Sequence, residues 1–213
     1  MKISKNAVIR LSQYKNVIYY LQSMGMKKVF SDNLADAVGV TASQVRRDFG
    51  IFGISGKRRG GYSIEELTNR LNVLLGKDKL QKVIVVGLGN VGRALVGYNG
   101  FTKDGIEISA GFDTDASKCK RQKGFTVFPI DKLQAFAKEN NIKVGIICVP
   151  EQSAQSIADL MMDTPIKGIL NFAPVRLKVK KDCLVHNVNL GMELEAVIYF
   201  VNCKDKGTLD EGN

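Results

Sequence analysis

The sequence predicts an α/β protein in which a winged helix-turn-helix domain precedes a doubly wound parallel sheet. Three observations lead to this prediction. Short helical patterns separated by glycines fill the first third of the chain, strands and helices alternate from residue 82 onward, and nearly all the excess positive charge lies in the first third. We therefore expect a first domain at residues 1–77, a second at 78–189, and a C-terminal helix with its tail at 190–213.

The first domain begins with a helix expected over residues 6–24, whose apolar side chains recur at helical spacing before Gly25. Two shorter helices follow. Ser31 is expected to cap one that closes at Gly39, and Thr41 is expected to cap the next. Two short helices joined by a tight turn that contains glycine form a helix-turn-helix.

A glycine-rich stretch follows the helix-turn-helix and is interpreted as its wing. The basic triplet of residues 57–59 would form the tip of a hairpin that ends at Tyr62, and four glycines flank the triplet: Gly53, Gly56, Gly60 and Gly61. Ser63 then begins a helix with two acidic residues in its first turn, where the helix dipole favours them. Gly76 marks the end of this helix and of the domain.

Charge is divided unevenly along the chain, whose formal net charge is +10. Residues 1–77 contain 13 Lys and Arg against 5 Asp and Glu, whereas the remaining residues contain 18 against 16. Phosphate contacts dominate nucleic-acid affinity, so this asymmetry predicts a polyanionic partner for the first domain. On charge alone, a solvated basic face that aids solubility is the alternative.

The second helix of a helix-turn-helix enters the major groove with its N-terminal residues at the base edges. Arg pairs bidentately with guanine and Gln with adenine, and Arg58 at the wing tip is the candidate for the minor groove. For Arg46 and Arg47, ordinary solvation of an exposed helix face is the alternative. The predicted DNA-binding residues are phosphate contacts in the first helix of the chain and base or groove contacts in the recognition helix and the wing. They are Lys5, Arg10, Tyr14, Ser43, Gln44, Arg46, Arg47, Lys57, Arg58 and Arg59.

The second domain alternates strands and helices. Strands are expected over residues 83–86, 106–112, 144–149 and 168–171, with helices over 90–98, 130–140 and 151–162 between them. This alternation predicts a parallel sheet with crossover helices. A further apolar helix is expected over residues 191–201.

The motif Gly87-Leu-Gly89-Asn-Val-Gly92 follows the first of these strands and opens a helix. In that context it matches the dinucleotide-binding fingerprint of Rossmann domains. Gly87 would permit the tight turn, Gly89 the approach of the backbone to a pyrophosphate, and Gly92 close packing of the helix on the strand. A glycine cluster required only for packing is the alternative.

Asp113 stands at the end of the second strand, 24 positions after Gly89. A carboxylate there can accept hydrogen bonds from the adenosine ribose hydroxyls and repels a 2′-phosphate, so the sequence favours NAD(H) over NADP(H). The basic residues downstream weaken this preference without reversing it: Lys118, Lys120, Arg121 and Lys123.

No residue pattern indicates catalysis. His186 is the only histidine, and a Tyr-x-x-x-Lys pair or a nucleophile elbow is absent from the sequence. We therefore expect a sensor rather than an enzyme. A small NAD-dependent oxidoreductase with a basic N-terminal extension is the alternative.

The composition also bears on metals, redox state and location. The four cysteines are scattered, so we expect reduced structural thiols and no metal site: Cys119, Cys148, Cys183 and Cys203. The longest apolar run, residues 144–150, has strand length, and the N-terminus lacks the apolar stretch of a signal peptide. A cytoplasmic protein without membrane contact is expected.

Taken together, these motifs resemble the Rex family, bacterial repressors that sense the NADH/NAD⁺ balance. The resemblance covers essentially the whole chain. It rests on Arg10-Leu-x-x-Tyr14, residues 43–53 running into 56–62, the fingerprint GLGNVGRAL, Tyr98-x-Gly-Phe101, Phe112-Asp113, Val149-Pro150 with Ala154-Gln155, and residues 168–174.

The resemblance implies a homodimer in which the C-terminal helix, near residues 190–201, is exchanged with the partner subunit. It further implies that NADH binding releases a palindromic operator DNA, whereas NAD⁺ competes for the same site and is compatible with DNA binding. Tyr98 would take part in switching and Arg10 would be an interdomain contact. The nucleotide-binding set expected from motif and resemblance is Gly87, Gly89, Asn90, Val91, Gly92, Tyr98, Asp113, Cys148, Val149, Pro150 and Leu190.

Two residues depart from the family pattern. Arg59 stands where a small residue is common in the wing, which bears on the fit to the minor groove. Asn189 stands where many relatives carry aspartate, just before the apolar residue that approaches the nicotinamide, here Leu190. Loss of that carboxylate would weaken a charge contact with Arg10.

Overall fold

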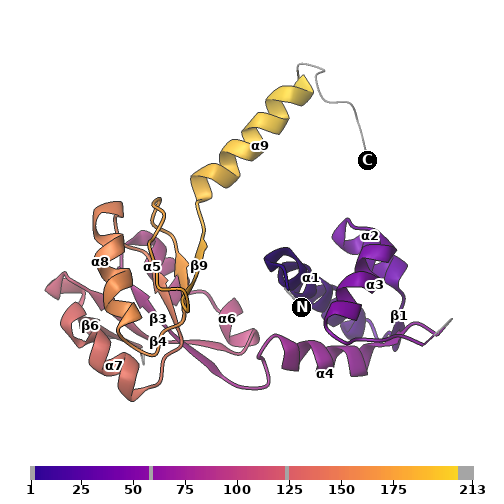
Figure 1. Cartoon of the computed structure of the whole chain (residues 1–213), viewed down its shortest axis with the longest axis horizontal. Helices are drawn as coiled ribbons and strands as arrows, with labels where there is room; N and C mark the ends of the chain where they lie inside the picture. The colour runs from indigo at the N-terminus through magenta and orange to yellow at the C-terminus, as the bar shows by residue number, and fades with distance from the viewer. Residues whose placement is uncertain (1–2, 58–59, 123–124, 206–213) are drawn as a thin grey trace. The chain divides into compact units, whose positions relative to one another are not determined.

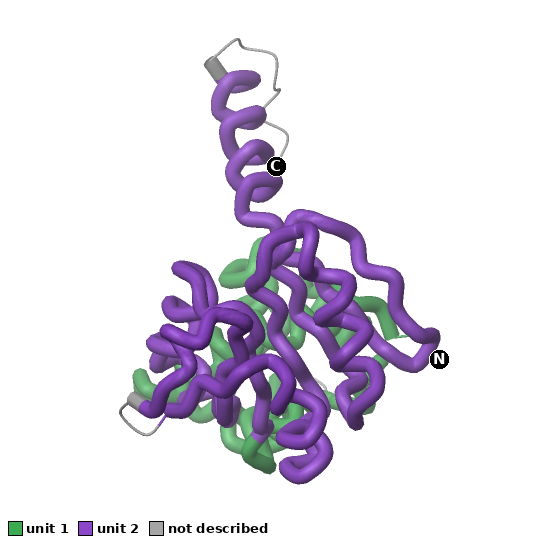
Figure 2. The backbone as a smooth tube through the Cα atoms, turned by 90° about the vertical axis from the view of Figure 1, so that its left-hand side faces the viewer, with its two compact units in different colours: residues 1–80 green, residues 81–213 purple. Residues whose placement is uncertain are grey.

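The computed structural model describes residues 3–57, 60–122 and 125–205 (Figure 1). The chain divides into two compact units, Met1–Leu80 and Gln81–Asn213 (Figure 2). The division lies three residues beyond the expected boundary, because Gln81 already pairs with Ile106 in the sheet of the second unit. Arg58, Arg59 and Lys123 lie outside the described residues.

Unit 1 contains four helices and a short antiparallel sheet. The helices are α1 (Lys5–Ser23), α2 (Ser31–Val38), α3 (Ala42–Ile51) and α4 (Ile64–Leu74), and β1 (Lys28–Val29) pairs with β2 (Tyr62–Ser63). The predicted helix-turn-helix is confirmed as α2 and α3, and Gly39, in the left-handed region at φ 74°, closes α2.

The helix starts follow local capping chemistry. Thr41 accepts a hydrogen bond from the Gln44 N–H at 3.1 Å, as predicted, and Ser63 accepts one from Glu66. The prediction for Ser31 is wrong by one residue. Phe30 occupies the cap position, where its N–H donates to Asn33 Oδ1, and Ser31 is the first buried residue of α2.

The wing leaves the end of α3 and returns to the helices through β2. Lys57 and Gly61 form a single antiparallel bridge, and Tyr62 then pairs with Val29. A Cβ atom at Gly61, whose φ is 66°, would lie 2.7 Å from the Val29 carbonyl oxygen. Gly61 is therefore required where the wing passes close to β1.

The core of unit 1 forms between the inner faces of its helices. Phe49 of α3 makes edge-to-face contacts with Tyr14 and Tyr62 at centroid distances of 5.4 and 5.0 Å. Val45 and Phe49 are buried, whereas Arg46 and Arg47 are exposed on the other side of the same helix. Packing thus fixes which face of α3 is presented to solvent.

Unit 2 is built on a seven-stranded sheet. Six strands are parallel, and β5 is antiparallel at one edge. The order is β5 (Arg121–Gln122), β6 (Phe125–Pro129), β4 (Ile106–Asp113), β3 (Gln81–Val86), β7 (Val144–Ile147), β8 (Gly168–Asn171) and β9 (Leu184–Asn187). The predicted doubly wound parallel sheet is confirmed, because the order runs outward in both directions from β3.

Helices cover both faces of this sheet. The side chains of β3 alternate: Ile84 and Val86 face a core formed with α7 (Leu133–Glu139) and α8 (Glu151–Met162). Val83 and Val85 face a second core that includes Leu95 and Val96 of α5 (Asn90–Val96). The remaining short elements are α6 (Gly100–Lys103) and the 3₁₀ turns η1 (Ala116–Lys118) and η2 (Ile130–Lys132).

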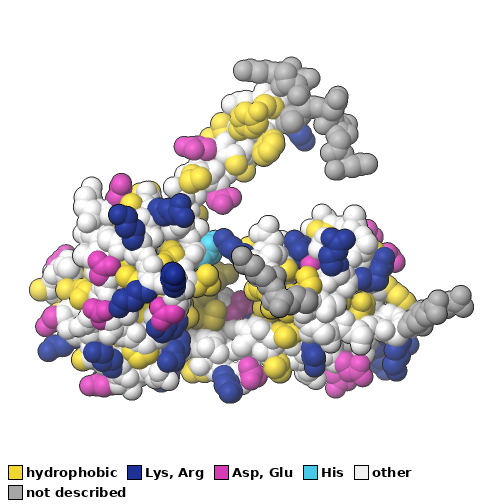
Figure 3. All heavy atoms as spheres, in the orientation of Figure 1, with side chains coloured by type: hydrophobic (Ala, Val, Ile, Leu, Met, Phe, Trp, Pro, Cys, Tyr) yellow, Lys and Arg dark blue, Asp and Glu magenta, His cyan; other side chains and the backbone are white. Residues whose placement is uncertain are grey.

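The last helix, α9 (Leu190–Asp205), has an apolar surface that the described residues of unit 2 leave exposed (Figure 3). Eight large apolar side chains on it are each between 50% and 64% exposed: Leu190, Met192, Leu194, Val197, Ile198, Tyr199, Phe200 and Val201. Soluble proteins seldom expose so continuous an apolar surface without a partner. Among the described residues, no helix is both long and apolar enough to cross a membrane.

Candidate functional site

The glycine-rich loop joins β3 to α5 at the carboxyl end of the sheet. Gly87 has φ 91°, and a Cβ atom on it would lie 2.5 Å from the carbonyl oxygen of Cys148, the residue just after the neighbouring strand β7. A Cβ atom on Gly92 would lie 2.0 Å from the carbonyl oxygen of Gly87. Both positions therefore require glycine, as the fingerprint predicts.

Gly89 differs from these two glycines. A Cβ atom there would meet no protein atom within 4 Å, so packing within the chain does not explain the residue. It is the cap residue of α5, and no side chain caps that position. An open position at the start of the helix fits the predicted approach of a ligand to the backbone.

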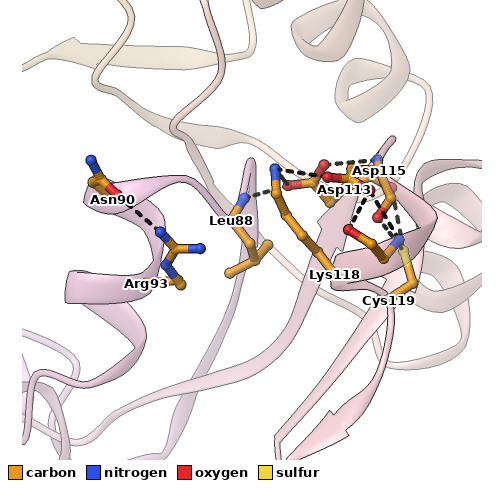
Figure 4. Close-up of polar contacts among 8 residues, drawn as sticks. Leu88, Asn90, Arg93, Asp113, Asp115, Lys118 and Cys119 are labelled. Carbon is orange, nitrogen blue, oxygen red and sulfur yellow. Dashed lines mark hydrogen bonds and ion pairs between the residues drawn. The ribbon is translucent and has the colours of Figure 1, made fainter.

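Asp113 lies at the end of β4, beside the glycine-rich loop (Figure 4). One carboxylate oxygen accepts from the Leu88 N–H at 2.7 Å and from Lys118 Nζ at 3.2 Å, and the other accepts from the Asp115 N–H at 2.9 Å. Burial favours the neutral acid, but these bonds outweigh it and hold the pKa of Asp113 below its usual range. The residue is therefore an anion that ties the loop to β4.

A cleft of about 500 Å³ opens at the carboxyl ends of β3, β4 and β7. Asp113 at the end of β4 and Ser153 in the first turn of α8 are among its polar lining residues. The structure brings seven of the predicted nucleotide-binding residues into this one cleft: Gly87, Gly89, Val91, Asp113, Cys148, Val149 and Pro150. Ligands of open α/β sheets bind at such a place, where the strand order reverses.

Four predicted residues do not line the cleft. Asn90 accepts from Arg93 Nη2 at 2.9 Å, and Gly92 is buried behind the loop. Tyr98 is exposed and stacks edge-to-face on Phe101 at 5.0 Å, and Leu190 is exposed at the start of α9. Within unit 2 alone, Tyr98 and Leu190 thus contribute nothing to the cleft that Asp113 lines.

Lys118 and Ser153 line the cleft but are absent from the predicted nucleotide-binding set. Lys118 is the last residue of η1, which brings its ammonium group back to Asp113 and to Asp115, 3.2 and 3.7 Å away. Ser153 follows Pro150 into α8. The signal that could have identified both was their place just after the ends of β4 and β7.

Cys148 lines the cleft as a neutral thiol. Burial raises its pKa to about 11, so the thiolate that reacts with oxidants or electrophiles is scarce at neutral pH. His186 lies in β9 and does not line the cleft.

In unit 1, α3 exposes three of the predicted DNA-binding residues on one side: Ser43, Arg46 and Arg47. Arg46 also lines a groove of about 420 Å³ together with Lys57 of the wing and Phe30 before α2. Lys5 is exposed in the first turn of α1. Arg46 of α3 and Lys57 of the wing therefore share one surface.

Three other predicted DNA contacts are instead engaged by Asp48, a fully buried carboxylate on the inner side of α3. Arg10 donates to it twice, at 2.6 and 2.8 Å, and Tyr14 Oη donates at 2.9 Å. Gln44 Nε2 donates at 2.7 Å from one turn before. Burial favours the neutral acid, but these bonds hold the pKa of Asp48 below its usual range.

The structure contradicts the predicted phosphate contact of Tyr14, whereas the predicted DNA contacts of Arg10 and Gln44 stay predictions. Tyr14 is fully buried and its hydroxyl donates to Asp48, so it is not available to a phosphate. Burial together with Asp48 raises the pKa of Tyr14 to about 12. The amide N–H of Gln44, which adenine recognition would need, points to Asp48 rather than to a base. The Arg10 guanidinium is held bidentately inside unit 1 and joins α1 to α3.

Comparison with known proteins identifies the family. Residues 78–175 match the family described as "CoA binding domain", and residues 2–50 match "Putative DNA-binding protein N-terminus". The chain is 39% identical over 208 residues to the redox-sensing transcriptional repressor Rex of Lactobacillus gasseri, covering 97% of each chain. It is 40% identical over 199 residues to the Rex repressor of Carboxydothermus hydrogenoformans, covering 93% of this chain and 96% of that one. The chain belongs to the Rex family.

Solved Rex-family structures have the same architecture. The Rex-family repressor RSP is 34% identical to this chain, and its structure without a named ligand has a TM-score of 0.87 with 96% of each chain covered. RSP has also been solved with β-NADH, at a TM-score of 0.86 over 96% of this chain and 97% of that one. The structure of RSP with β-NAD⁺ and operator DNA has a TM-score of 0.90, with 96% of this chain and 95% of that one covered. The resemblance to Rex found in the sequence is thereby confirmed over nearly the whole chain.

Proposed function

We propose that this chain is a transcriptional repressor that binds operator DNA through unit 1 and releases it when NADH binds in unit 2. The observation that carries the proposal is the cleft at Asp113 in a chain that also presents Arg46 and Arg47 on a helix-turn-helix. Solved structures of the relative RSP, one with β-NADH and one with β-NAD⁺ and operator DNA, support both halves. The relatives of this chain are repressors rather than enzymes, and we assign no catalytic step to the cleft.

Within this proposal, the dinucleotide lies along the carboxyl edge of the sheet. Asp113 would accept hydrogen bonds from the adenosine ribose, and the backbone at Gly89 would face the pyrophosphate. Cys148, Val149 and Pro150 would lie toward the nicotinamide, because β7 is on the other side of β3 from β4. NAD⁺ would occupy the same place and leave DNA binding intact.

We further propose that the protein acts as a homodimer in the cytoplasm. The exposed apolar surface of α9 supports this assembly, since a second copy could cover it. A dimer with two recognition helices would bind a palindromic operator, with half-sites separated by whole helical turns. In this assembly Leu190 and Tyr98 would join the nucleotide site or its switching.

The operator-binding assay tests the proposal. Fluorescence anisotropy of labelled operator DNA measures the release. NADH should release the protein at low micromolar concentration, which corresponds to a binding free energy of about −8 kcal/mol. NAD⁺ at the same concentration should leave it bound. Operator affinity that neither nucleotide changes would contradict the proposal.

Asp113→Ala is expected to weaken NADH binding at least about tenfold, because two hydrogen bonds to the ribose lose their acceptor. The variant also frees the Leu88 N–H, so the loop and ribose contributions need separating. Asp131→Ala, which changes an exposed aspartate in η2, is the matched control and should leave NADH affinity unchanged. Isothermal titration calorimetry measures both, and unchanged affinity in Asp113→Ala would refute the assignment of the ribose partner.

Arg46→Ala is expected to lower operator affinity by about 1–3 kcal/mol and to relax the preference for one base. Its side chain is exposed on α3 and contributes no core packing, so folding and NADH affinity should be unaffected. Arg176→Ala, an exposed arginine of unit 2, is the control. Anisotropy with the operator and with single-base variants of it measures the effect, and equal losses on all sequences would make Arg46 a phosphate contact instead.

A further inference from the structure

Phe30 occupies a place on unit 1 that the stability of the fold does not explain. It precedes α2 at the cap position, where its side chain accepts no hydrogen bond from the first turn of the helix. Residues with a side-chain oxygen are preferred there because they cap the free N–H groups, and apolar residues are strongly disfavoured. The residue is also 47% exposed, so burial does not compensate for the missing cap. A residue that breaks a local rule without a gain in packing is typical of a functional site.

The ring of Phe30 is nevertheless held in place against the wing. A Cβ atom on Gly61 would lie 3.0 Å from Phe30 Cδ1 and 3.1 Å from Cε1, so the ring uses the space that a side chain at Gly61 would fill. The backbone is fixed as well, because the Phe30 N–H donates to Asn33 Oδ1 at 3.1 Å. Phe30 is thus an ordered aromatic residue that remains half exposed.

Phe30 lines the groove of about 420 Å³ that Arg46 and Lys57 share. Ile54 adds a second apolar side chain to this groove. The two cations face one carboxylate, that of Asp32, so positive charge is in excess. The groove therefore fits a ligand that combines an apolar surface with negative charge.

The sugar–phosphate backbone of DNA combines these two properties. Each deoxyribose presents carbon–hydrogen groups, and the phosphates on either side of it are anions. In a helix-turn-helix the first helix crosses the backbone while the second enters the major groove. Here α2 is the first helix, and Phe30 immediately precedes it. The ring therefore lies where the backbone of bound DNA would pass.

We propose that Phe30 packs on a deoxyribose of the operator backbone, with Lys57 at an adjacent phosphate. Contacts of this kind fix the register of a protein on the duplex without reading its sequence. The inference rests on the proposed function, because that function places operator DNA on α3 and the wing. It adds an apolar contact to a surface that the charge pattern of the chain describes only through its cations.

Phe30→Ser in the full chain tests the contact, with fluorescence anisotropy of operator DNA that the wild type has selected from random-sequence duplexes. We expect operator affinity to fall about five- to tenfold, because the exposed part of the ring no longer gains from burial against the sugar. The loss should be equal on the operator and on single-base variants of it, since every nucleotide has the same sugar. Phe30→Leu, which keeps an apolar side chain, should recover most of the affinity.

Two further measurements distinguish a DNA contact from a role in folding. The slope of log affinity against log salt concentration should be the same in Phe30→Ser and wild type, because no cation is removed. The thermal midpoint of unit 1 should not fall, because serine supplies the cap that phenylalanine lacks. Tyr20→Ser, which changes an exposed aromatic residue of α1 that does not line the groove, is the matched control and should bind operator DNA as the wild type does.

Three results would overturn the inference. Unchanged operator affinity in Phe30→Ser means that the ring does not touch DNA. A loss confined to operators with thymine at one position, which deoxyuridine at that position reproduces in the wild type, means that the ring contacts a thymine methyl group instead. A fall in the thermal midpoint large enough to account for the lost affinity means that Phe30 acts on the fold. Absence of operator binding in the wild type would contradict the proposed function itself, and so differs from all three.

Discussion

Replacement of Asp48 by alanine is expected to destabilise unit 1 by about 3 kcal/mol, the lower end of the range for breaking a buried ion pair. The lower end applies because the Arg10 side chain is 23% exposed and can regain some hydration. The variant leaves Tyr14 Oη without its acceptor in the core and releases the contact between α1 and α3. Operator binding should fall with the folded population of unit 1, whereas NADH binding in unit 2 should persist.

Hydrogen–deuterium exchange resolved by peptide measures this effect. Amides of α1 and α3 that open with the whole unit should exchange about a hundredfold faster, while peptides of β3 and β4 should be unchanged. Asp36→Ala, which changes an exposed aspartate of α2, is the control. Unchanged exchange in α1 and α3 would show that Asp48 does not stabilise their packing.

The contribution of Asp48 to the stability of unit 1 is expected to depend on pH. The pKa of Asp48 in the folded chain lies below its ordinary value, so its stabilising effect is fully present above that value, about 4, and is lost as the pH falls through the folded-state pKa. The difference in stability between wild type and Asp48→Ala should therefore shrink in acid.

The double variant Leu194→Asp/Ile198→Asp is expected to abolish the proposed dimer. These residues lie one turn apart on α9 and are 60% and 50% exposed in the single chain. Burial of each side chain against a partner would contribute about 1.5–3 kcal/mol to the free energy of association. Aspartate loses this contribution and adds the cost of desolvating a charge. The fold of unit 2 itself should be little affected, because its described residues leave these side chains exposed.

Sedimentation equilibrium should give the mass of a single chain, 23.4 kDa, for the variant and twice that mass for the wild type. Operator affinity should fall about a hundredfold or more, because two linked recognition helices gain from effective concentration. Glu195→Ala on the same helix is the control and should remain dimeric. A variant that stays dimeric would place the interface elsewhere.

The sequence predicted the elements whose pattern is local. The strand before Gly87, the glycine turn at Gly39 and the cap at Thr41 depend on near neighbours, and the structure has them as expected. The edge strand β9 was not predicted because it is only partly buried, so it lacks a continuous apolar run. The pair β1 and β2 was not predicted because two residues are too few to show an alternation.

The site residues also divide into those that local sequence pattern places and those that only tertiary packing brings together. The place of Asp113 at the end of the second strand was predicted from the strand pattern and the spacing from Gly89, and the structure has it there, whereas its role as ribose partner stays a prediction. The role of Asp48 was not predicted, because its partners Arg10 and Tyr14 are 38 and 34 residues away and only tertiary packing brings them together. For the same reason, the burial of Tyr14 and the bond from Gln44 to Asp48 were not predicted. A polar residue on an amphipathic helix does not reveal a buried acceptor behind it.

Nucleotide binding in unit 2 and operator binding in unit 1 are expected to oppose each other, and the mutual effect of the two ligands on each other's affinity tests this most directly. The affinity for NADH is measured by calorimetry in the absence and presence of saturating operator DNA. Because coupling between two sites is reciprocal, the operator should weaken NADH binding by the same factor by which NADH weakens operator binding. An NADH affinity that operator DNA leaves unchanged would contradict this expectation, even if both ligands bind.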